Sequence, residues 1–514
     1  MARATRRARG LPPRVQKGGL QDDTPFTPRM PFAFLRDLPG WWPYAVGLVI
    51  LAFNLAASGH VLLQKRDVRA ALAWVGLIWF VPAIGAVLYA ALGMNRIRRL
   101  ASELQRERRR IPLATPRDTM IARVGTEVTV PPSLKALARL GEAVSGRPLL
   151  TGNSLHALHN GDEAYPEMIA AIDAARHTVA LATYIFGDDN AGKPFVEALA
   201  RAAKRGVQVR VLIDGVGTRY TWPPVERALR RTGVRTALFR PGIRDAGLGF
   251  FNLRSHRKVL TVDGRIAFTG GLNIQARNIL KDDPPRQVRD LHFRLDGPIV
   301  GQLQEVFVED WAFTTREILD GPGWFPTLLA VGESTARAYT DGPDGDIEIL
   351  RTVLLGAIAG ARDSVRIVTP YFLPDQGLVG ALHVAALRGV AVDIVLPSKV
   401  NIPLVQWAAT AQLWQVLRPG CRVYETPMPF DHTKLMVVDR EWVLFGSSNW
   451  DPRSLRLNFE LDVECHDPRL AAQMDGLVAS KIAEGRQITL DEVDGRPLVI
   501  KIGHAVARLM SPYL

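Results

Sequence analysis

Two long apolar runs without a charged residue stand near the start of the chain. They cover residues 41–63 and 70–92, and each contains 23 residues. A helix of that length extends about 34 Å, enough to cross the ~30 Å hydrocarbon core of a bilayer. Aromatic residues at 41–44 stand where an interfacial belt would lie. The pattern predicts a two-helix transmembrane hairpin over 41–92, and a pair of buried core helices is the alternative.

Basic residues flank the two runs unequally. The short connection carries three of them, whereas seven arginines lie between residues 96 and 110. Because positive charge favours the cytoplasmic side of a membrane, we expect the connection outside the cell and both flanks in the cytoplasm. Residues 1–40 mix basic residues with Pro and Gly and are expected to be a disordered tail. Residues 93–145 read as an arginine-rich linker.

Beyond the linker, helix-like and strand-like patterns alternate, and the second half repeats the order of the first. This predicts an α/β fold with pseudo-two-fold symmetry, in which two lobes, 146–318 and 335–490, each form a mostly parallel or mixed sheet covered by helices. The closing residues 491–514 are amphipathic, which is typical of an interfacial helix or of a helix packed on the lobes. The alternating runs are 166–175, 179–185, 194–205 and 208–213, then 347–361, 365–369, 377–387 and 392–396.

One short pattern occurs once in each lobe. A histidine is followed by a lysine two positions later, an aspartate five positions after the lysine, and an asparagine ten positions after the aspartate. A lone His-x-Lys carries little information, but the duplicated register indicates an internal repeat that builds one catalytic site from two halves. The residues are His256, Lys258, Asp263 and Asn273 in the first copy, and His432, Lys434, Asp439 and Asn449 in the second.

Each copy is expected to form a β-hairpin, because apolar and β-branched residues continue on both sides of the aspartate. Side chains at positions i and i+2 share one face of a strand, so each imidazole points the same way as the lysine that follows it. Asp263 and Asp439 are out of phase with these pairs, at the strand end. We therefore expect both aspartates to support the turn and the site indirectly.

Two imidazoles and two ammonium groups suit a phosphodiester. Lysines neutralise phosphate as point charges, and Asn273 and Asn449 can donate to its oxygens. One histidine can attack phosphorus while the other protonates the leaving alkoxide. An unperturbed imidazole pKa near ~6.5 would let the two differ in protonation at neutral pH. Because the lysines already supply positive charge, we expect no metal and no cofactor.

Three features outside the repeated pattern bear on the site. Asp290 and Glu460 follow the two copies, and we expect them to orient the imidazoles by accepting an N–H; surface acids are the alternative. Asp431 directly precedes His432, where an apolar residue is expected, and its charge could raise the imidazole pKa. Trp450 stands where a smaller apolar residue is expected.

At these residues the chain resembles the phospholipase D superfamily, and within it the bacterial cardiolipin synthases. The resemblance covers roughly residues 41–514. It also includes the segments Thr183–Phe186 and Thr369–Phe372, which resemble the opening strands of the two halves. The motif neighbourhoods that carry it are Asn252–Lys258, Arg289–His292, Asn449–Ser454 and Asn458–Glu460.

The resemblance implies a phosphatidyltransferase that joins two phosphatidylglycerol molecules through a phosphohistidine and releases glycerol, with His256 as nucleophile and His432 as acid and base. It also implies a multi-pass protein of the bacterial inner membrane, with the catalytic lobes in the cytoplasm. A phospholipase D that hydrolyses lipids is the main alternative. A membrane-bound nuclease of the superfamily and a non-enzymatic scaffold are further alternatives.

Composition limits the partners. Lys and Arg number 64 against 51 Asp and Glu, a formal net charge of +13, which favours an anionic membrane surface or nucleic acid. Two apolar spans favour the membrane, so phosphatidylglycerol and other anionic lipids are expected and nucleic acid is not. The only cysteines, Cys421 and Cys465, provide neither a disulfide framework nor a metal cluster.

Overall fold

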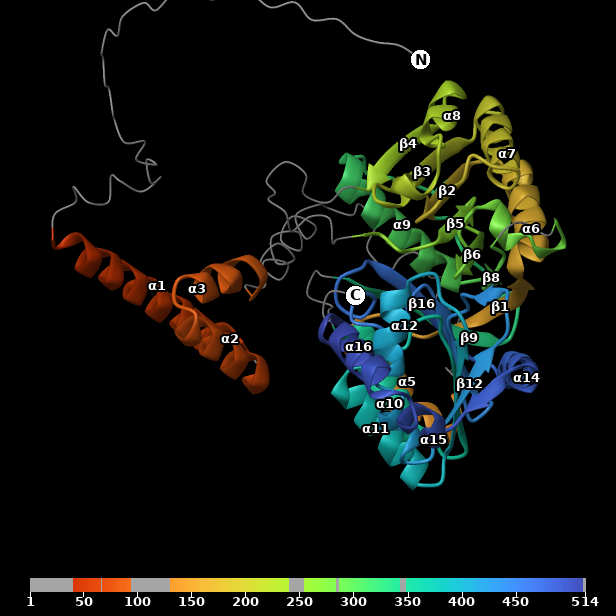
Figure 1. Ribbon diagram of the computed structural model, residues 1–514. Helices are drawn as coiled ribbons and strands as arrows, with labels where there is room; N and C mark the ends of the chain where they lie inside the picture. The colour runs from red at the N-terminus through yellow and green to blue at the C-terminus, as the bar shows by residue number, and fades with distance from the viewer. Residues whose placement is uncertain are drawn as a thin grey trace, which may run out of the picture. The chain divides into compact units, whose positions relative to one another are not determined.

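The computed structural model describes residues 40–65, 67–93, 130–239, 254–282, 286–342 and 348–511. It divides into two units, an N-terminal unit up to residue 95 and a catalytic unit from residue 96 to the C-terminus (Figure 1). The predicted basic tail up to residue 39 and the linker between 94 and 129 lie outside the described residues.

The N-terminal unit contains one long apolar helix and a shorter, broken second arm. The elements are α1 (Trp42–Gln64), α2 (Val68–Phe80), α3 (Ile84–Leu88) and a π-helical turn (Tyr89–Gly93). Among the described residues, α1 alone has the length and apolarity to cross a membrane. The prediction of a second continuous helix over 70–92 is therefore wrong.

Pro82 accounts for the break in the second arm. Proline lacks a backbone N–H and clashes with the preceding turn, which interrupts a helix. The next residue, Ala83, has a φ of 64°. The Asn54 side chain of α1 accepts the Ala83 N–H at 3.4 Å, and His60 is hydrogen-bonded to the Tyr89 hydroxyl at 2.7 Å. The broken arm is thus held against α1 by polar contacts as well as by apolar packing.

The catalytic unit is built on a single mixed sheet of 15 strands, where the sequence predicted two separate sheets. The first strands of the two lobes, β1 and β9, pair antiparallel in the middle and join the lobes edge to edge. In spatial order the first lobe contributes β1 (Leu150–His159), β8 (Leu291–Asp296), β6 (Ile266–Gly270), β5 (Val259–Val262), β2 (Thr178–Thr183), β3 (Gln208–Asp214) and β4 (Arg235–Phe239).

The second lobe repeats this order and adds one edge strand. It contributes β9 (Ser334–Asp341), β16 (Glu460–His466), β15 (Trp442–Gly446), β14 (Leu435–Val438), β10 (Ser364–Val368), β11 (Ala391–Pro397), β12 (Arg422–Thr426) and the extra β17 (Arg486–Ile488). In each lobe the three outer repeated strands are parallel and the others antiparallel. The predicted mixed α/β fold and its internal repeat are confirmed.

Helices cover both faces of the sheet. One face carries α9 (Ile299–Thr315) and α14 (Pro468–Glu484), whose apolar residues share one core with strands of both lobes. The other face carries α6 (Asn160–Ala174), α7 (Gly192–Lys204) and α8 (Glu226–Arg231) in the first lobe, and α10 (Ile349–Gly360), α11 (Gln376–Leu387) and α13 (Trp414–Leu417) in the second. Three further helices, α12 (Pro403–Thr410), α15 (Leu490–Asp494) and α16 (Leu498–Leu509), lie in the second lobe.

Helix α5 (Lys135–Ser145) was assigned to the linker by its sequence, but it packs on α10 and belongs to the core of the second lobe. Gly141 makes the close approach possible, because a Cβ there would lie 2.0 Å from the Tyr339 hydroxyl. The chain therefore enters the catalytic unit on the second lobe before it builds the first. The expected linker, 93–145, ends at about residue 130.

Candidate active site

The two histidines lie where the lobes exchange short backbone ladders. The His256 N–H donates to the Phe459 carbonyl at 2.8 Å, and the His432 N–H donates to the Arg289 carbonyl at 2.7 Å. The residues just before them pair in parallel with the same segments of the opposite lobe, in one case as β13 (Phe430–Asp431) with β7 (Val288–Arg289). Each histidine is thereby fixed to the lobe that it does not belong to.

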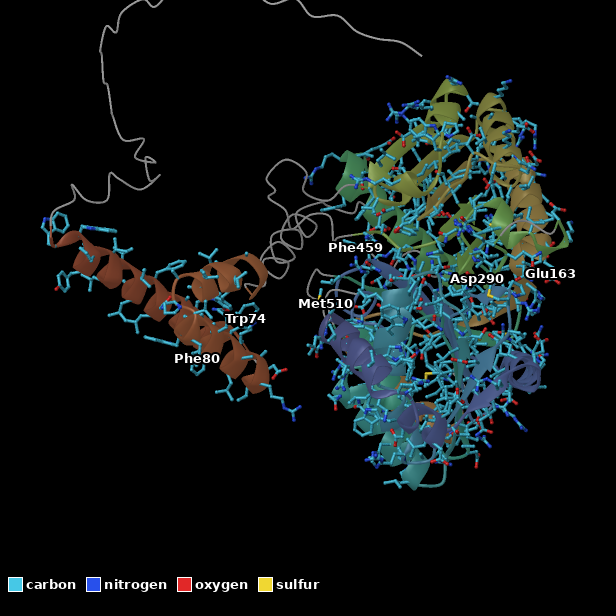
Figure 2. All side chains as sticks on the ribbon, viewed as in Figure 1. Trp74, Phe80, Glu163, Asp290, Phe459 and Met510 are labelled. Carbon is cyan, nitrogen blue, oxygen red and sulfur yellow. The ribbon has the colours of Figure 1, made fainter. Side chains whose placement is uncertain are left out.

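The imidazoles pair with buried carboxylates across the same boundary. His256 Nδ1 lies 2.9 Å from Glu460 Oε2, and His432 Nδ1 lies 2.7 Å from Asp290 Oδ2 (Figure 2 labels Asp290). Glu460 is 0% and Asp290 4% exposed, so neither is a surface acid. The pairing crosses between lobes, because each histidine uses the carboxylate that follows the other motif. With Nδ1–H donated to a carboxylate, the Nε2 lone pair is left for chemistry.

The two lysines are buried beside their histidines. Lys258 Nζ donates to the His256 carbonyl at 2.6 Å, and Lys434 Nζ donates to the His432 carbonyl at 2.5 Å. Burial lowers the pKa of Lys258 to about 7 and that of Lys434 to about 8, and Lys434 further lowers the pKa of Lys258. The two ammonium groups are therefore close enough to repel one another, which makes the site a strong attractor for an anion.

The environment of both imidazoles favours their neutral form. Burial lowers the pKa of His432 to about 4, with Lys434 acting in the same direction and Asp290 opposing. Burial also lowers the pKa of His256, and both lysines add to this while Glu460 opposes it. The expectation of unperturbed imidazoles is therefore wrong. A neutral imidazole is ready to attack phosphorus, whereas the acid gains its proton only when a bound anion raises its pKa.

These lysine pKa values predict a fall in kcat/KM as the pH rises above about 7, the lower of the two values. A lysine loses its charge as the pH rises through its pKa, so an anionic lipid binds more weakly on the alkaline side. The measurement is kcat/KM between pH 6 and 10 for the wild type and for Lys258→Arg. The arginine stays charged throughout, so kcat/KM of this variant should begin to fall at a higher pH than in the wild type, even if its activity is lower. A wild-type profile that is flat to pH 10 would contradict the assignment.

The two asparagines are buried near the same loops, each 6% exposed. Asn273 Oδ1 accepts the Ile185 N–H at 3.2 Å, so only its NH₂ end can donate to a phosphate oxygen. Asn449 Nδ2 donates to Ser454 Oγ at 3.2 Å. The amides are thus positioned by the segments that follow β2 and β15.

Asp263 and Asp439 lie at the far ends of β5 and β14 from the histidines. Both adopt left-handed backbone, with φ of 51° and 52°. Each carboxylate accepts three backbone N–H groups at the start of a neighbouring strand, β2 or β10. Both aspartates therefore support the hairpin turn from a position away from the imidazoles. The donors are Arg176, His177 and Thr178 for Asp263, and Arg362, Asp363 and Ser364 for Asp439.

Asp263→Ala is expected to destabilise the protein by about 2 kcal/mol, because hydrogen bonds to a charged group are stronger than neutral ones and here several are lost together. The loss should appear as a lower apparent Tm in detergent, with little change in activity per folded molecule. Asp494→Ala, at an exposed position on α15, is the control. A loss of activity without a change in Tm would place Asp263 in the chemistry.

Two tyrosines flank the imidazoles and were missed as site residues. The Tyr184 ring lies 5.0 Å from the His256 ring in an edge-on arrangement, and the Tyr371 ring lies 6.5 Å from His432. Lys258 Nζ lies 5.7 Å from the centre of the Tyr184 ring. The available signal was their place within three residues of the ends of β2 and β10, at the carboxyl ends of strands, where α/β sites commonly lie.

The lobes differ at the carboxylates. Ser447 Oγ donates to Glu460 Oε2 at 2.5 Å. The corresponding residue in the first lobe is Gly271, where a Cβ would lie 2.0 Å from Asp290 Oδ1. Glu460 therefore has a hydroxyl partner, whereas no side chain at position 271 would fit beside Asp290.

The two departures from the expected pattern are accommodated by packing. Asp431 forms a buried ion pair with Lys481, so its charge is balanced away from the imidazole. Burial would raise the pKa of Asp431, but Lys481 and Thr433 hold it below its usual value. Trp450 stacks on Phe372 with ring centres 6.0 Å apart and lines an apolar pocket together with residues of α10 and β14.

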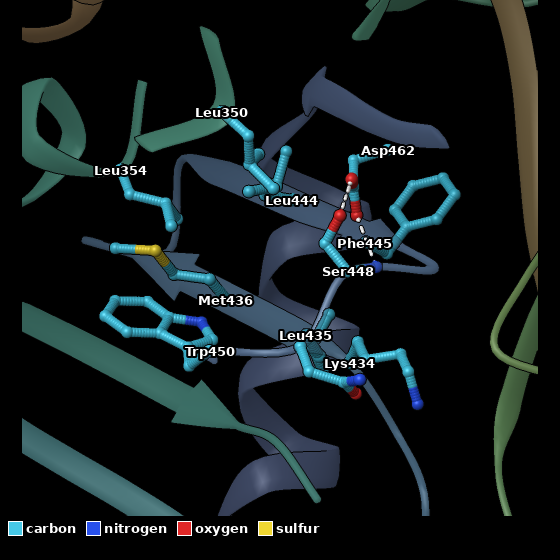
Figure 3. Close-up of a pocket in the computed structure, with 11 residues that line it drawn as sticks. Leu350, Leu354, Lys434, Leu435, Met436, Leu444, Phe445, Ser448, Trp450 and Asp462 are labelled. Carbon is cyan, nitrogen blue, oxygen red and sulfur yellow. Dashed lines mark hydrogen bonds between the residues drawn. The ribbon is translucent and has the colours of Figure 1, made fainter. Parts of the chain in front are cut away.

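Figure 3 shows that pocket, which the site residues Lys434 and Asn449 help to line. Its apolar wall includes Leu350, Leu354 and Met436, and Lys434 stands at its edge. Ser448 donates to Asp462 on the polar side. Burial raises the pKa of Asp462 to about 7. In the part of the chain that the structure describes, no group of three or more His, Cys, Asp or Glu residues could hold a metal.

Comparison with known proteins identifies this arrangement. The sequence profile of the family described as "Cardiolipin synthase, PLD-like domain" matches residues 168–311 and 354–480, more than half of the chain. The chain belongs to this family. A second profile, "Phospholipase_D-nuclease N-terminal", matches residues 52–93. Family membership confirms the resemblance found in the sequence and the predicted class of enzyme, a phosphatidyltransferase of the phospholipase D type.

Similar proteins extend over nearly the whole chain. Cardiolipin synthase A of Pseudomonas putida is 30% identical over 486 residues, which cover 93% of this chain and 98% of that protein. The major cardiolipin synthase of Bacillus subtilis is 31% identical over 461 residues, 88% of this chain and 95% of that protein. The crystal structure of a phosphatidylserine synthase from Haemophilus influenzae covers 74% of this chain and 100% of its own, with a TM-score of 0.58 and 14% identity, and shows the shared fold.

Proposed function

We propose that this family member joins two phosphatidylglycerol molecules to form cardiolipin and releases glycerol. The observation that carries the proposal is the pair of imidazoles, each backed by a buried carboxylate of the opposite lobe and accompanied by a buried lysine. Two such units around one anion can attack phosphorus from one side and protonate the leaving group on the other.

In the first half-reaction, a bond forms between His256 Nε2 and phosphorus while the bond from phosphorus to the glycerol oxygen breaks. His432 gives its Nε2 proton to that oxygen, and glycerol leaves. In the second, His432 removes the proton from a glycerol hydroxyl of the next lipid. That oxygen bonds to phosphorus as the P–N bond breaks, which releases His256 and cardiolipin.

The remaining residues stabilise the transferring phosphate. Lys258 and Lys434 neutralise the charge that builds on its oxygens, and the NH₂ groups of Asn273 and Asn449 donate to them. Asp290 and Glu460 keep the histidines in the Nδ1–H tautomer. One diester is exchanged for another, so the reaction needs no energy-rich cofactor.

Incubation of the purified full-length protein in detergent with phosphatidylglycerol alone tests the proposal. Cardiolipin and glycerol in equal amounts are the expected products. Phosphatidic acid and glycerol without cardiolipin would show hydrolysis and favour the phospholipase D alternative. No lipid turnover, with cleavage of added DNA, would favour the nuclease alternative.

We further propose a location in the bacterial inner membrane, with the catalytic unit on the cytoplasmic side. The support is the 23-residue apolar helix α1, the apolar α2–α3 arm after it, and the excess of basic residues beyond that arm. Thiol labelling of intact cells that carry a cysteine at Gln473, an exposed site on α14, tests the sidedness. Labelling from outside by an impermeant reagent would contradict it.

A further inference from the structure

Helix α16 turns its apolar face away from the protein. Five of its residues lie on one face at helical spacing and remain 55–81% exposed: Leu498, Val499, Ile502, Val506 and Leu509. The opposite face, which includes the buried Ala507, packs against α12. Surface helices normally bury such a stripe, so this outward face needs an apolar partner. Figure 1 shows α16 beside α12 in the second lobe.

Helix α12 and the residue before it extend the same surface. Trp407 is 48% exposed, and its ring lies 6.1 Å from the His504 ring of α16, nearly parallel to it. Ile402 and Leu404 are also exposed. The face therefore combines an aliphatic stripe with a tryptophan at its margin, as in helices that lie in a membrane interface.

The surface continues to the active site. Beneath α12 and α16, Ala507 shares a small apolar cluster with Leu373 and the partly buried Tyr371. Tyr371 is the residue whose ring lies beside the His432 imidazole. A lipid chain that lies on α12 and α16 is thus next to the segment that forms one wall of the phosphate site.

The first lobe presents aromatic residues at the equivalent place. Tyr220 and Trp222 follow β3 as α12 follows β11, and they are 55% and 84% exposed. The Tyr220 ring lies 5.9 Å from Tyr184, the tyrosine beside His256. Both lobes therefore expose apolar side chains next to the tyrosine that flanks their own histidine.

Basic residues border the apolar face. Lys501 and Arg508 lie along one side of the α16 stripe, Lys399 precedes α12, and Arg227 lies over the Trp222 ring at 5.7 Å. We propose that α16, α12 and the Tyr220–Trp222 loop form the surface by which the catalytic unit rests on an anionic bilayer, so that lipids enter the site from the membrane plane. These basic side chains suit anionic headgroups and disfavour a second copy of the same face.

The role of this surface in lipid entry depends on the proposed function, but binding of the surface to a bilayer can be tested without catalysis. Full-length protein with Val499→Cys or Val506→Cys carries an environment-sensitive fluorophore and is reconstituted into phosphatidylglycerol-containing vesicles. The native Cys421 and Cys465 are buried, which limits unwanted labelling. Gln473→Cys, exposed on α14 on the other side of the second lobe in Figure 1, is the control.

Brominated lipids are expected to quench the probes at 499 and 506 and to leave the probe at 473 unaffected. Probes at 499 and 506 that stay exposed to water would overturn the proposal. Probes that are shielded from water but not quenched would mean that protein covers the face, which also overturns it.

Activity provides a separate measure. Val499→Asp with Val506→Asp should lower the ratio of vesicle activity to micelle activity by about tenfold or more, since apolar contact with the bilayer is lost. Gln473→Asp should leave that ratio unchanged. An unchanged ratio in the double variant would contradict the proposal. Failure of the wild type to make cardiolipin in micelles would instead refute the proposed function and leave the quenching result intact.

Discussion

Alanine in place of either His256 or His432 is expected to lower turnover of phosphatidylglycerol by about 10⁴-fold or more, because each half-reaction needs one imidazole on phosphorus and one on the exchanging oxygen. The two histidines act as a unit, so the double variant should be little worse than either single variant. Measurement of cardiolipin formation in detergent gives the rates. His177→Ala, which alters an exposed histidine outside the site, is the matched control and should keep full activity.

A lipid substrate with a nitrophenyl group in place of the glycerol headgroup separates the two roles. Nitrophenolate leaves without a proton, so His432→Ala should still form a phosphohistidine on His256 and then stall. His256→Ala should form none. Mapping of the trapped phosphate to His432 would reverse the assignment of nucleophile and acid, and full activity in either variant would remove that histidine from the mechanism.

The duplicated motif allowed the core of this site to be predicted from the sequence. The spacing of His and Lys placed both groups together, and the phase of Asp263 and Asp439 separated them from the imidazoles. Local periodicity also located the helix–strand–helix–strand run near the start of each lobe, α6 to β3 and α10 to β11, because each of these elements buries its own apolar face. Features that depend only on neighbouring residues in the sequence could thus be predicted.

Features that depend on contacts between residues far apart in the sequence could not be predicted in the same way. Nothing in the sequence indicates that β1 and β9 join the lobes into one sheet, since edge pairing is decided by backbone groups that every strand carries. Helix α5 was assigned to a linker because the segment 93–145 that contains it is rich in arginine. The sequence does not indicate that Leu137 and the preceding Leu134 are buried against the second lobe. The run 70–92 was predicted to be one helix although Pro82 lies within it, whereas α2 ends before this proline.

The depressed imidazole pKa values were missed for a related reason. Reference values apply to solvated groups, and the enclosure of His432 where the lobes meet, with a side chain only 12% exposed, is a property of the assembled fold. Which carboxylate serves which histidine has the same origin. Asp290 follows the first motif and Glu460 the second, yet the short ladders between lobes exchange them.

Because the carboxylates are exchanged, a substitution at Glu460 should disable His256 and one at Asp290 should disable His432. Sequence order alone would predict the opposite assignment. Glu460→Gln should disable His256, because an amide can donate to Nδ1 and move the imidazole proton to Nε2, the atom that must attack phosphorus. Formation of the phosphohistidine from the nitrophenyl lipid should fall by about 10³-fold or more. Asp290→Asn should disable His432 instead, so the same adduct should form at a near-normal rate while turnover of phosphatidylglycerol is lost.

Glu333→Gln, at an exposed ion pair with Arg469, is the matched control for loss of a carboxylate and should affect neither reaction. If the pairing followed sequence order, Asp290→Asn would block adduct formation and Glu460→Gln would spare it. The comparison therefore tests the crossed geometry independently of whether the acceptor is a lipid or water, because both variants are compared at the step before the acceptor enters. An equal loss of adduct formation in the two variants would mean that each carboxylate supports the whole site through its charge. It would also mean that neither carboxylate acts by fixing the tautomer of one imidazole.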